Sequence, residues 1–226
     1  MKIGSSVNFM FKKISKFFMR KTYIEPLCDS FRYTPIYDSF AGGSLARSNI
    51  LVITNNDIDE EVVKNVFEKE NCYLSLLCLD NEQLSCDTIK TSLLNFVGPV
   101  NCFINIVHIN EDNYLINNNH FNGTDSLRLL YAWLQKETDY LISFNIHATI
   151  SSAVIKDESI DSNSIGASAN AIIKGLARVL GNHGIIENGL VADANVQFED
   201  VLHTLVYLSS KYGQVLVGEV LNMRSN

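Results

Sequence analysis

Metal binding and nucleophilic catalysis are the chemistries that the 5 histidines and 5 cysteines of this chain could support. No histidine stands at a metal-ligand spacing from another histidine or from a cysteine, and no two cysteines are separated by two residues. The chain also lacks the Gly-x-Ser-x-Gly and Walker motifs of hydrolases and nucleotidases. We therefore expect no metal site, and we expect the cysteines to remain thiols in a reducing compartment.

The loop that follows the apolar run at residues 50–54 could in principle bind nucleotide phosphates. Such a loop needs glycines, which let the backbone approach a pyrophosphate and leave the next helix open to it. No glycine occurs between Gly43 and Gly98. The loop carries two amides and two carboxylates instead: Asn55, Asn56, Asp57 and Asp59. The acids would repel phosphate, so the loop predicts that no dinucleotide binds; acids in a first helical turn also have an ordinary role in stabilising the helix.

Apolar runs alternate with amphipathic segments from residue 49 onwards. The runs predict strands at 50–54, 73–79, 101–107, 140–150 and 215–223. The amphipathic segments predict helices at 57–68 (capped by Asp57), 87–97, 125–136, 168–180 and 201–210. This alternation is typical of an α/β fold, a Rossmann-like three-layer α/β/α arrangement with a parallel sheet. We expect the domain to span residues 48–226, after an irregular lead-in at 1–47.

Several segments of the chain fall in the order and spacing of one known family. They are residues 98–105, 169–185, 184–188 (Gly-Ile-Ile-Glu-Asn) and 207–221, with Leu79-Asp80 upstream. This set resembles the short-chain dehydrogenase/reductase (SDR) superfamily, in particular its 3-oxoacyl-ACP-reductase-like members, over roughly residues 45–223. The resemblance matches Asp80 to the Asp of the family's third strand. It therefore implies that one strand–helix unit is missing from the first half.

The resemblance also implies a catalytic Tyr-x-x-x-Lys at the start of the long helix. In the family the Tyr donates a proton, while the Lys lowers the pKa of the Tyr and holds the ribose. Alignment on Gly175-Leu176 puts Gly166 at the Tyr position and Asn170 at the Lys position. Ser152 matches the family's catalytic Ser with an offset of one residue, or is an ordinary serine near a strand end. The degenerate positions predict that no catalytic residue remains.

Other family features are reduced or misplaced. The Asn-Asn-Ala-Gly motif after the fourth strand keeps only its first residue, Asn105. Residues 194–198 alone separate Asp193 from the terminal helix, so the substrate-covering lid is essentially absent. The Tyr-x-x-x-Lys pattern of residues 207–211 lies in the segment that resembles the terminal helix, far from the active-site helix.

Charge is unevenly distributed along the chain. The net charge of −7 and the pI of about 5.2 argue against nucleic acid as a ligand. Residues 1–22 nevertheless carry 6 basic residues and no acid, and residues 8–21 have a basic amphipathic pattern. That segment could lie on a membrane surface, dock on a partner, act as a transit peptide or be a solvated tail. We expect an intracellular protein, cytoplasmic or, if residues 1–22 are a transit or docking segment, mitochondrial.

The combined losses predict a catalytically inactive SDR-like protein that acts as a structural or interaction subunit. Members of the family pair through two long helices, here 125–136 and 168–180, so we expect a homo- or hetero-oligomer. The faces in question are apolar or small: Leu127, Leu130 and Leu134, then Ala167, Ala171, Gly175 and Ala177. Two alternatives remain open, a divergent NAD(P)-dependent ketoreductase and a small-molecule sensor that uses the remnant cleft. No cofactor is expected under the first hypothesis, and NAD(P) under the ketoreductase alternative.

Overall fold

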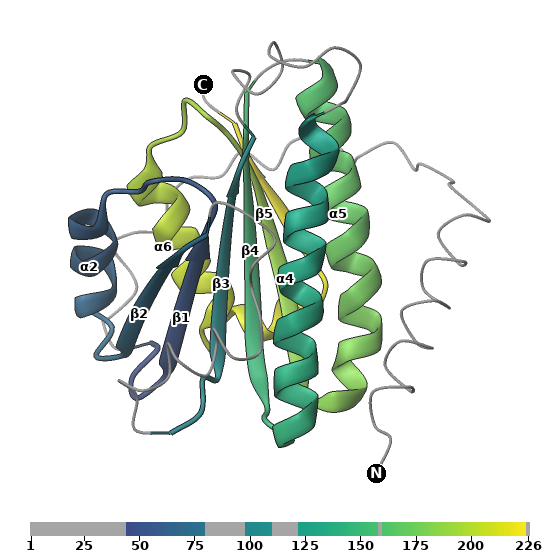
Figure 1. Cartoon of the computed structure of the whole chain (residues 1–226). Coiled ribbons are helices and arrows are strands. Elements are labelled where there is room, and N and C mark those ends of the chain that lie inside the picture. Colours follow the sequence, from purple (N-terminus) through teal and green to yellow (C-terminus); the bar gives the residue numbers. More distant parts are fainter. Residues whose placement is uncertain (1–43, 80–97, 110–121, 158–159, 225–226) are drawn as a thin grey trace. The chain divides into compact units, whose positions relative to one another are not determined.

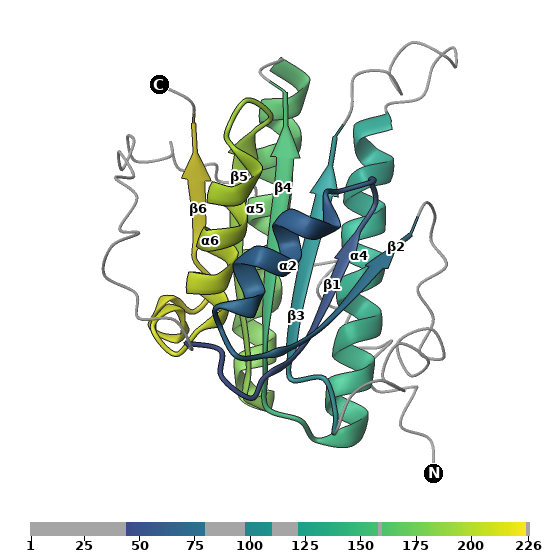
Figure 2. The ribbon, with the colours of Figure 1, turned by 90° about the vertical axis from the view of Figure 1, so that its left-hand side faces the viewer.

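Six parallel strands form one sheet in the computed structural model, in the order β2-β1-β3-β4-β5-β6 (Figures 1 and 2). The structure describes residues 44–79, 98–109, 122–157 and 160–224. The strands are β1 (Asn49–Thr54), β2 (Tyr73–Cys78), β3 (Cys102–His108), β4 (Ala148–Lys156), β5 (Ile185–Asp193) and β6 (Val220–Met223). Every neighbouring pair runs parallel.

Helices cover both faces of the sheet. In the described part of the chain these are α2 (Glu60–Glu68), α4 (Asn122–Phe144), α5 (Ile160–Leu180) and α6 (Phe198–Ser209). The long helices α4 and α5 lie side by side on one face, and α2 and α6 cover the other (Figures 1 and 2). Short 3-10 turns, η3 (Gly181–His183) and η4 (Gly213–Leu216), follow α5 and α6. The expected three-layer α/β/α class is confirmed.

Burial of the central strands explains their unbroken apolar runs. Every residue of β1 and β4 is buried, and β3 and β5 are buried at all but one position each. A strand with helices on both faces needs apolar side chains at odd and even positions alike. The edge strand β2 is only half-buried. The sheet core therefore lies along β1, β3, β4 and β5.

The first half of the sheet is shorter than in a full SDR. Helix α2 ends at Glu68 and β2 begins at Tyr73, directly beside β1. No strand–helix unit stands between α2 and β2, as the sequence predicts. The helix expected at 87–97, Asp80 and the basic segment 8–21 lie outside the described residues.

Some element boundaries differ from the sequence prediction. Residues 140–144 were expected to begin a strand, but they complete α4, because Tyr140 and Leu141 continue its buried stripe. Asn145, with a φ of 53°, then ends the helix in a left-handed conformation. Helix α5 begins at Ile160 rather than at 168, and β6 contains only the last four residues of the run expected at 215–223.

Candidate functional site

The switch point of the sheet lies between β1 and β3. Strand β1 has β2 on one side and β3 on the other, so the chain winds in opposite directions from this pair. Open α/β sheets bind ligands in the crevice at the carboxyl ends of two such strands. In this chain the crevice is bordered by the residues that follow Thr54 and by His108.

Asn55 bridges the two strand ends at this switch point. Its Nδ2 donates a hydrogen bond to the carbonyl of His108 at 3.0 Å, and its Oδ1 accepts one from the amide of His108 at 2.7 Å. The side-chain amide thus pairs with β3 as an additional backbone residue would. The carboxyl ends of β1 and β3 are therefore joined by a side chain.

The amino terminus of α2 is closed by a carboxylate of the chain itself. Asp59 is the N-cap, and its Oδ1 accepts hydrogen bonds from the amides of Glu61 at 2.9 Å and Val62 at 3.3 Å. The sequence-based assignment of the cap to Asp57 was wrong. Asp59 is preferred because its extended backbone aims the carboxylate at the first helical turn. Amides that could bind phosphate here already have an anionic acceptor.

The residues between these two closures form a tight turn. The hydroxyl of Thr54 donates to the carbonyl of Asn56 at 3.1 Å and accepts from its amide at 3.3 Å. The thiol of Cys78, at the end of β2, lies 3.6 Å from the same carbonyl. Of the four loop residues that the sequence singled out, Asn55 and Asn56 are half-buried in this turn, whereas Asp57 and Asp59 are exposed.

The positions matched to the catalytic Tyr and Lys of the family both lie on α5. Gly166 is buried, and a Cβ atom there would lie 3.1 Å from Val191 Cγ1 and 3.4 Å from Lys156 Cδ. Asn170, one turn further along α5, is half-buried. The place that a larger side chain at 166 would need is taken by the aliphatic stem of Lys156.

Ser152 and Asn105 meet within the sheet. They face each other in register on β4 and β3, and Asn105 Nδ2 lies 3.4 Å from Ser152 Oγ. Both residues are fully buried, so neither can reach a substrate. Asn105 Nδ2 also donates to Glu137 Oε2 at 3.1 Å, which gives this amide a structural partner.

A buried ion pair closes the carboxyl ends of β4 and β5. Lys156 Nζ lies 2.7 Å from Asp193 Oδ1, and the two side chains are 9% and 11% exposed. Lys156 also donates to the carbonyl of Asp157 at 3.3 Å. The sequence analysis missed this pair, although a charged residue at the end of each of two apolar runs was a usable signal. Asp193 therefore holds the ammonium group of Lys156 at the strand ends.

Two buried glutamates were also missed. Burial, opposed by the hydrogen bond from Asn105, raises the pKa of Glu137 to about 8. Burial, and then the charge of Glu137, raises the pKa of Glu187 well above its usual range. The available signal was weak: Glu137 stands four residues after Trp133, on the apolar stripe of α4.

The loop between β5 and α6 is short, as the sequence predicts. Strand β5 ends at Asp193 and α6 begins at Phe198, and the amide of Val196 donates to the carbonyl of Asp193 at 3.0 Å within this turn. Tyr207 and Lys211 lie at the other end of α6, and Lys211 Nζ stands 5.1 Å from the ring of Tyr212. The literal Tyr-x-x-x-Lys pattern is therefore remote from the switch point.

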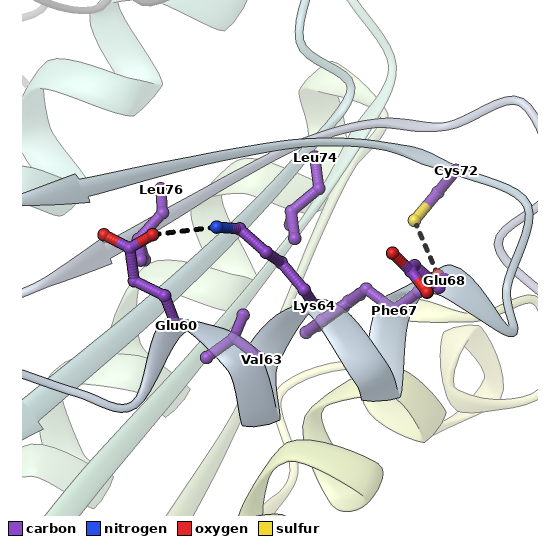
Figure 3. Close-up of a pocket in the computed structure, with 8 residues that line it drawn as sticks. All are labelled: Glu60, Val63, Lys64, Phe67, Glu68, Cys72, Leu74 and Leu76. Atoms are coloured by element: carbon purple, nitrogen blue, oxygen red, sulfur yellow. Dashed lines mark hydrogen bonds and ion pairs between the residues drawn. The ribbon is translucent and has the colours of Figure 1, made fainter.

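A groove of about 200 Å³ lies between α2 and β2 (Figure 3). Val63 and Phe67 of α2 and Leu74 and Leu76 of β2 form its apolar floor, and the Glu60–Lys64 ion pair lies at its rim (Figure 3). The groove is smaller than most small-molecule pockets. Burial raises the pKa of the Cys72 thiol, which borders the groove, to about 11, so that thiol is a poor nucleophile.

In residues 44–79, 98–109, 122–157 and 160–224, no group of three or more His, Cys, Asp or Glu could hold a metal ion. No helix within these ranges is both long and apolar enough to cross a membrane.

The parallel sheet, its switch point and the paired long helices define an SDR-like Rossmann fold, reduced by one unit. A protein described as a short-chain dehydrogenase/reductase from Sinorhizobium meliloti 1021 has a TM-score of 0.60 at 17% identity, covering 80% of this chain and 97% of its own. A short chain dehydrogenase from Leptospira borgpetersenii with bound NAD+ has a TM-score of 0.58 at 14% identity, covering 88% and 98%.

A third structure, a short chain dehydrogenase from Mycobacterium smegmatis, has a TM-score of 0.58 at 11% identity, covering 83% of this chain and 96% of its own. No family model and no curated protein sequence matches the chain. At these identities the similarity establishes the fold alone.

Proposed function

We propose that this chain is a non-catalytic SDR-like protein that acts as an interaction subunit. The observation that carries the proposal is the closed switch point. Asn55 joins the ends of β1 and β3, and Asp59 occupies the amides at the start of α2. A dinucleotide would have to displace both sets of hydrogen bonds and bring phosphates next to Asp59, Glu60 and Glu61.

The catalytic end of the fold supports the same proposal. Gly166 has no proton to donate, and its surroundings are filled by Val191 and the stem of Lys156. Ser152 is buried in the middle of β4. Hydride transfer needs a bound cofactor, a proton donor and an enclosed substrate together. Asn55 and Asp59 oppose binding of the cofactor, and Gly166 supplies no proton donor.

Cofactor titration tests the loss of binding. The unfolding midpoint of the full chain would be measured with and without NAD+, NADH, NADP+ and NADPH. A ligand at 100 times its dissociation constant adds about 2.7 kcal/mol of stability, which is several degrees for a domain of this size. We expect no shift with any of the four. A clear shift would overturn the proposal and favour the divergent oxidoreductase, whose structural neighbour from Leptospira borgpetersenii carries NAD+.

The partner surface is the outer side of α4 and α5. Of the residues that sequence analysis placed on this surface, Leu130, Leu134 and Ala177 are buried in the core of the chain and cannot meet a partner. Ala167 and Ala171 on α5 are exposed. Leu130, Leu134 and Ala177 are buried because the apolar stripe of each long helix packs on the sheet, so the outward face carries the remaining side chains.

Sedimentation velocity with surface variants tests this association. Ala167→Glu and Ala171→Glu place charge on the exposed side of α5, and we expect each to shift the chain toward monomer. Asn65→Glu, at an exposed position of α2, is the matched control and should leave the oligomeric state unchanged. A wild-type chain that stays monomeric at high concentration would leave only a hetero-oligomeric role for this surface. The proposal of self-association would then be withdrawn.

A further inference from the structure

Two carboxyl groups are buried between the sheet and its long-helix layer. Glu137 of α4 and Glu187 of β5 are both completely inaccessible to solvent. Glu187 lies two residues before Gly189, whose Cβ position faces Ile173 of α5, so the Glu187 side chain is on this same face of the sheet. Glu137 reaches the face from the opposite layer and accepts the hydrogen bond of Asn105.

Most of the polar atoms in this cluster have no partner. Glu137 Oε1, both carboxyl oxygens of Glu187 and Asn105 Oδ1 make no hydrogen bond. Among the described residues, the neighbouring elements contribute no cation: β3 brings Asn105, β4 brings Ser152, and α4 itself brings Tyr140. On α5, Lys174 is directed to Glu219 at 3.9 Å, and Arg178 is exposed.

Ionised carboxylates are not stable in such surroundings. A buried charge without a partner costs several kcal/mol, so an acid there keeps its proton instead. Two acids that feel each other's charge also cannot both ionise readily. Burial raises the pKa of Glu137 to about 8, and the pKa of Glu187 is raised further by the charge of Glu137.

We propose that Glu137 and Glu187 form a proton-dependent latch between α4 and the sheet, which holds the helix packed while both carboxyls are protonated and loosens it at mildly alkaline pH. Loss of the proton leaves a charge whose one hydrogen-bond partner among the described residues is Asn105, and α4 must shift to admit water. The latch would act whether or not α4 binds a partner, so it is independent of the proposed function.

Stability should depend on pH with a definite sign. An unfolded glutamate loses its proton near pH 4.5, whereas folded Glu137 keeps its proton to about pH 8. The folded state thus binds more protons throughout this window, and its stability falls as pH rises through it. The unfolding equilibrium constant is expected to increase about tenfold per pH unit for each retained proton. The contribution of Glu137 levels off once its folded pKa is passed.

Trp133 is a built-in reporter of the latch. It is the only tryptophan of the chain, is fully buried, and lies one helical turn before Glu137 on α4. Its indole Nε1 has no hydrogen-bond partner. Water that enters around an ionised Glu137 would therefore change the emission of this one fluorophore before the chain unfolds.

The test combines Trp133 emission with urea unfolding of the full chain between pH 5 and pH 10. For the wild type we expect a red shift of emission with a midpoint near pH 8, and the pH-dependent unfolding constant described above. Glu137→Gln and Glu187→Gln keep the side-chain shape but cannot ionise. The first should abolish the emission step, and each should remove about one proton from the pH slope. Glu68→Gln, exposed on α2, is the matched control and should change neither readout.

Two results would overturn the latch. One is wild-type emission and an unfolding constant that are both constant from pH 5 to pH 8. The other is an unfolding constant that depends on pH in Glu137→Gln and in Glu187→Gln as steeply as it does in the wild type. If one variant fails to fold, the wild-type titration and the other variant still decide the question.

Discussion

Single side chains close the places at which this fold usually meets ligands. Asn55 and Asp59 each bind two backbone groups, and Lys156 and Asp193 neutralise each other beside Gly166. A donor or charge that already has a strong partner in the folded chain is available to a ligand only at the cost of breaking that interaction. Each of these interactions can be tested by a variant that removes one of its partners.

The cap of α2 is the first such test. Asp59→Ala removes the acceptor for the amides of Glu61 and Val62, and we expect it to lower the free energy of unfolding by about 1 kcal/mol. Asp59→Ser keeps an oxygen acceptor without the charge and should stay close to the wild type. Urea denaturation measures both variants. A serine variant as unstable as the alanine variant would show that the charge, rather than the cap, stabilises the helix.

The Lys156–Asp193 pair is the second test. Lys156→Met keeps the stem that packs against Gly166 but leaves Asp193 as an unpaired, nearly buried charge. We expect a loss of about 3–5 kcal/mol, of which the double variant Lys156→Met/Asp193→Leu should recover most. Thermal and chemical denaturation provide the measurement. A loss below about 1 kcal/mol for the single variant would mean that water reaches the pair.

Elements are positioned by close backbone approaches as well as by apolar faces. The segment after α6 turns back at Gly213, whose carbonyl accepts a hydrogen bond from Asn188 Nδ2 at 3.1 Å, and so fixes the approach to β6. Helix α4 extends to Phe144 because its buried stripe continues, and it ends where Asn145 adopts a positive φ. Packing thus decides where these helices end.

A pair of glycine variants tests whether the close backbone approach at Gly213 is needed to position the segment after α6. A Cβ at Gly213 would lie 2.4 Å from the carbonyl oxygen of Tyr207, a backbone atom that cannot move aside. We expect Gly213→Ala to cost about 1–3 kcal/mol or more. Gly181→Ala is the control, because no atom lies within 4 Å of its Cβ position, and it should be neutral or slightly stabilising. Equal stabilities of the two variants would contradict the tight turn.

In the described part of the molecule, buried groups make stability depend on pH in two opposing directions. Burial lowers the pKa of His108, while it raises the pKa of Glu137 and Glu187. Below about pH 6.5 the unfolded chain binds a proton on His108, whereas in the folded chain burial disfavours that proton. This residue therefore reduces stability as pH falls. The glutamates reduce stability as pH rises above 4.5. The two glutamates retain two protons in the folded state, whereas His108 excludes one. The glutamates therefore determine the sign of the pH dependence.

We therefore expect maximum stability on the acid side of neutrality, near pH 5. Urea unfolding across a pH series would locate the maximum. His108→Gln should flatten only the acid limb, and the double variant Glu137→Gln/Glu187→Gln should move the maximum to higher pH. A wild-type maximum at pH 7 or above would contradict the balance of these three buried groups.

Local pattern was sufficient to predict the architecture. The unbroken apolar runs of β1, β3 and the first residues of β4 predicted a parallel sheet, since only strands covered on both faces need them. Strand β5 was not among the predicted strands. The glycine-free acidic loop after β1 and the short β5–α6 connection were equally visible, because turn chemistry and loop length are properties of consecutive residues. Segment 140–144 was mispredicted because its aromatic and branched residues suit a strand as well as a helix.

The pairings within the candidate site were decided by tertiary structure. Asn55 meets His108 across 53 residues, Lys156 meets Asp193 across 37, and Asn105 meets Glu137 across 32. Strand register and helix rotation determine which side chains face each other, and both depend on how the entire sheet packs. The sequence by itself determined the class of fold and the loss of its glycines, which are local and compositional. Only the folded chain decided which residues took over the vacated positions, because that depends on partners distant in sequence.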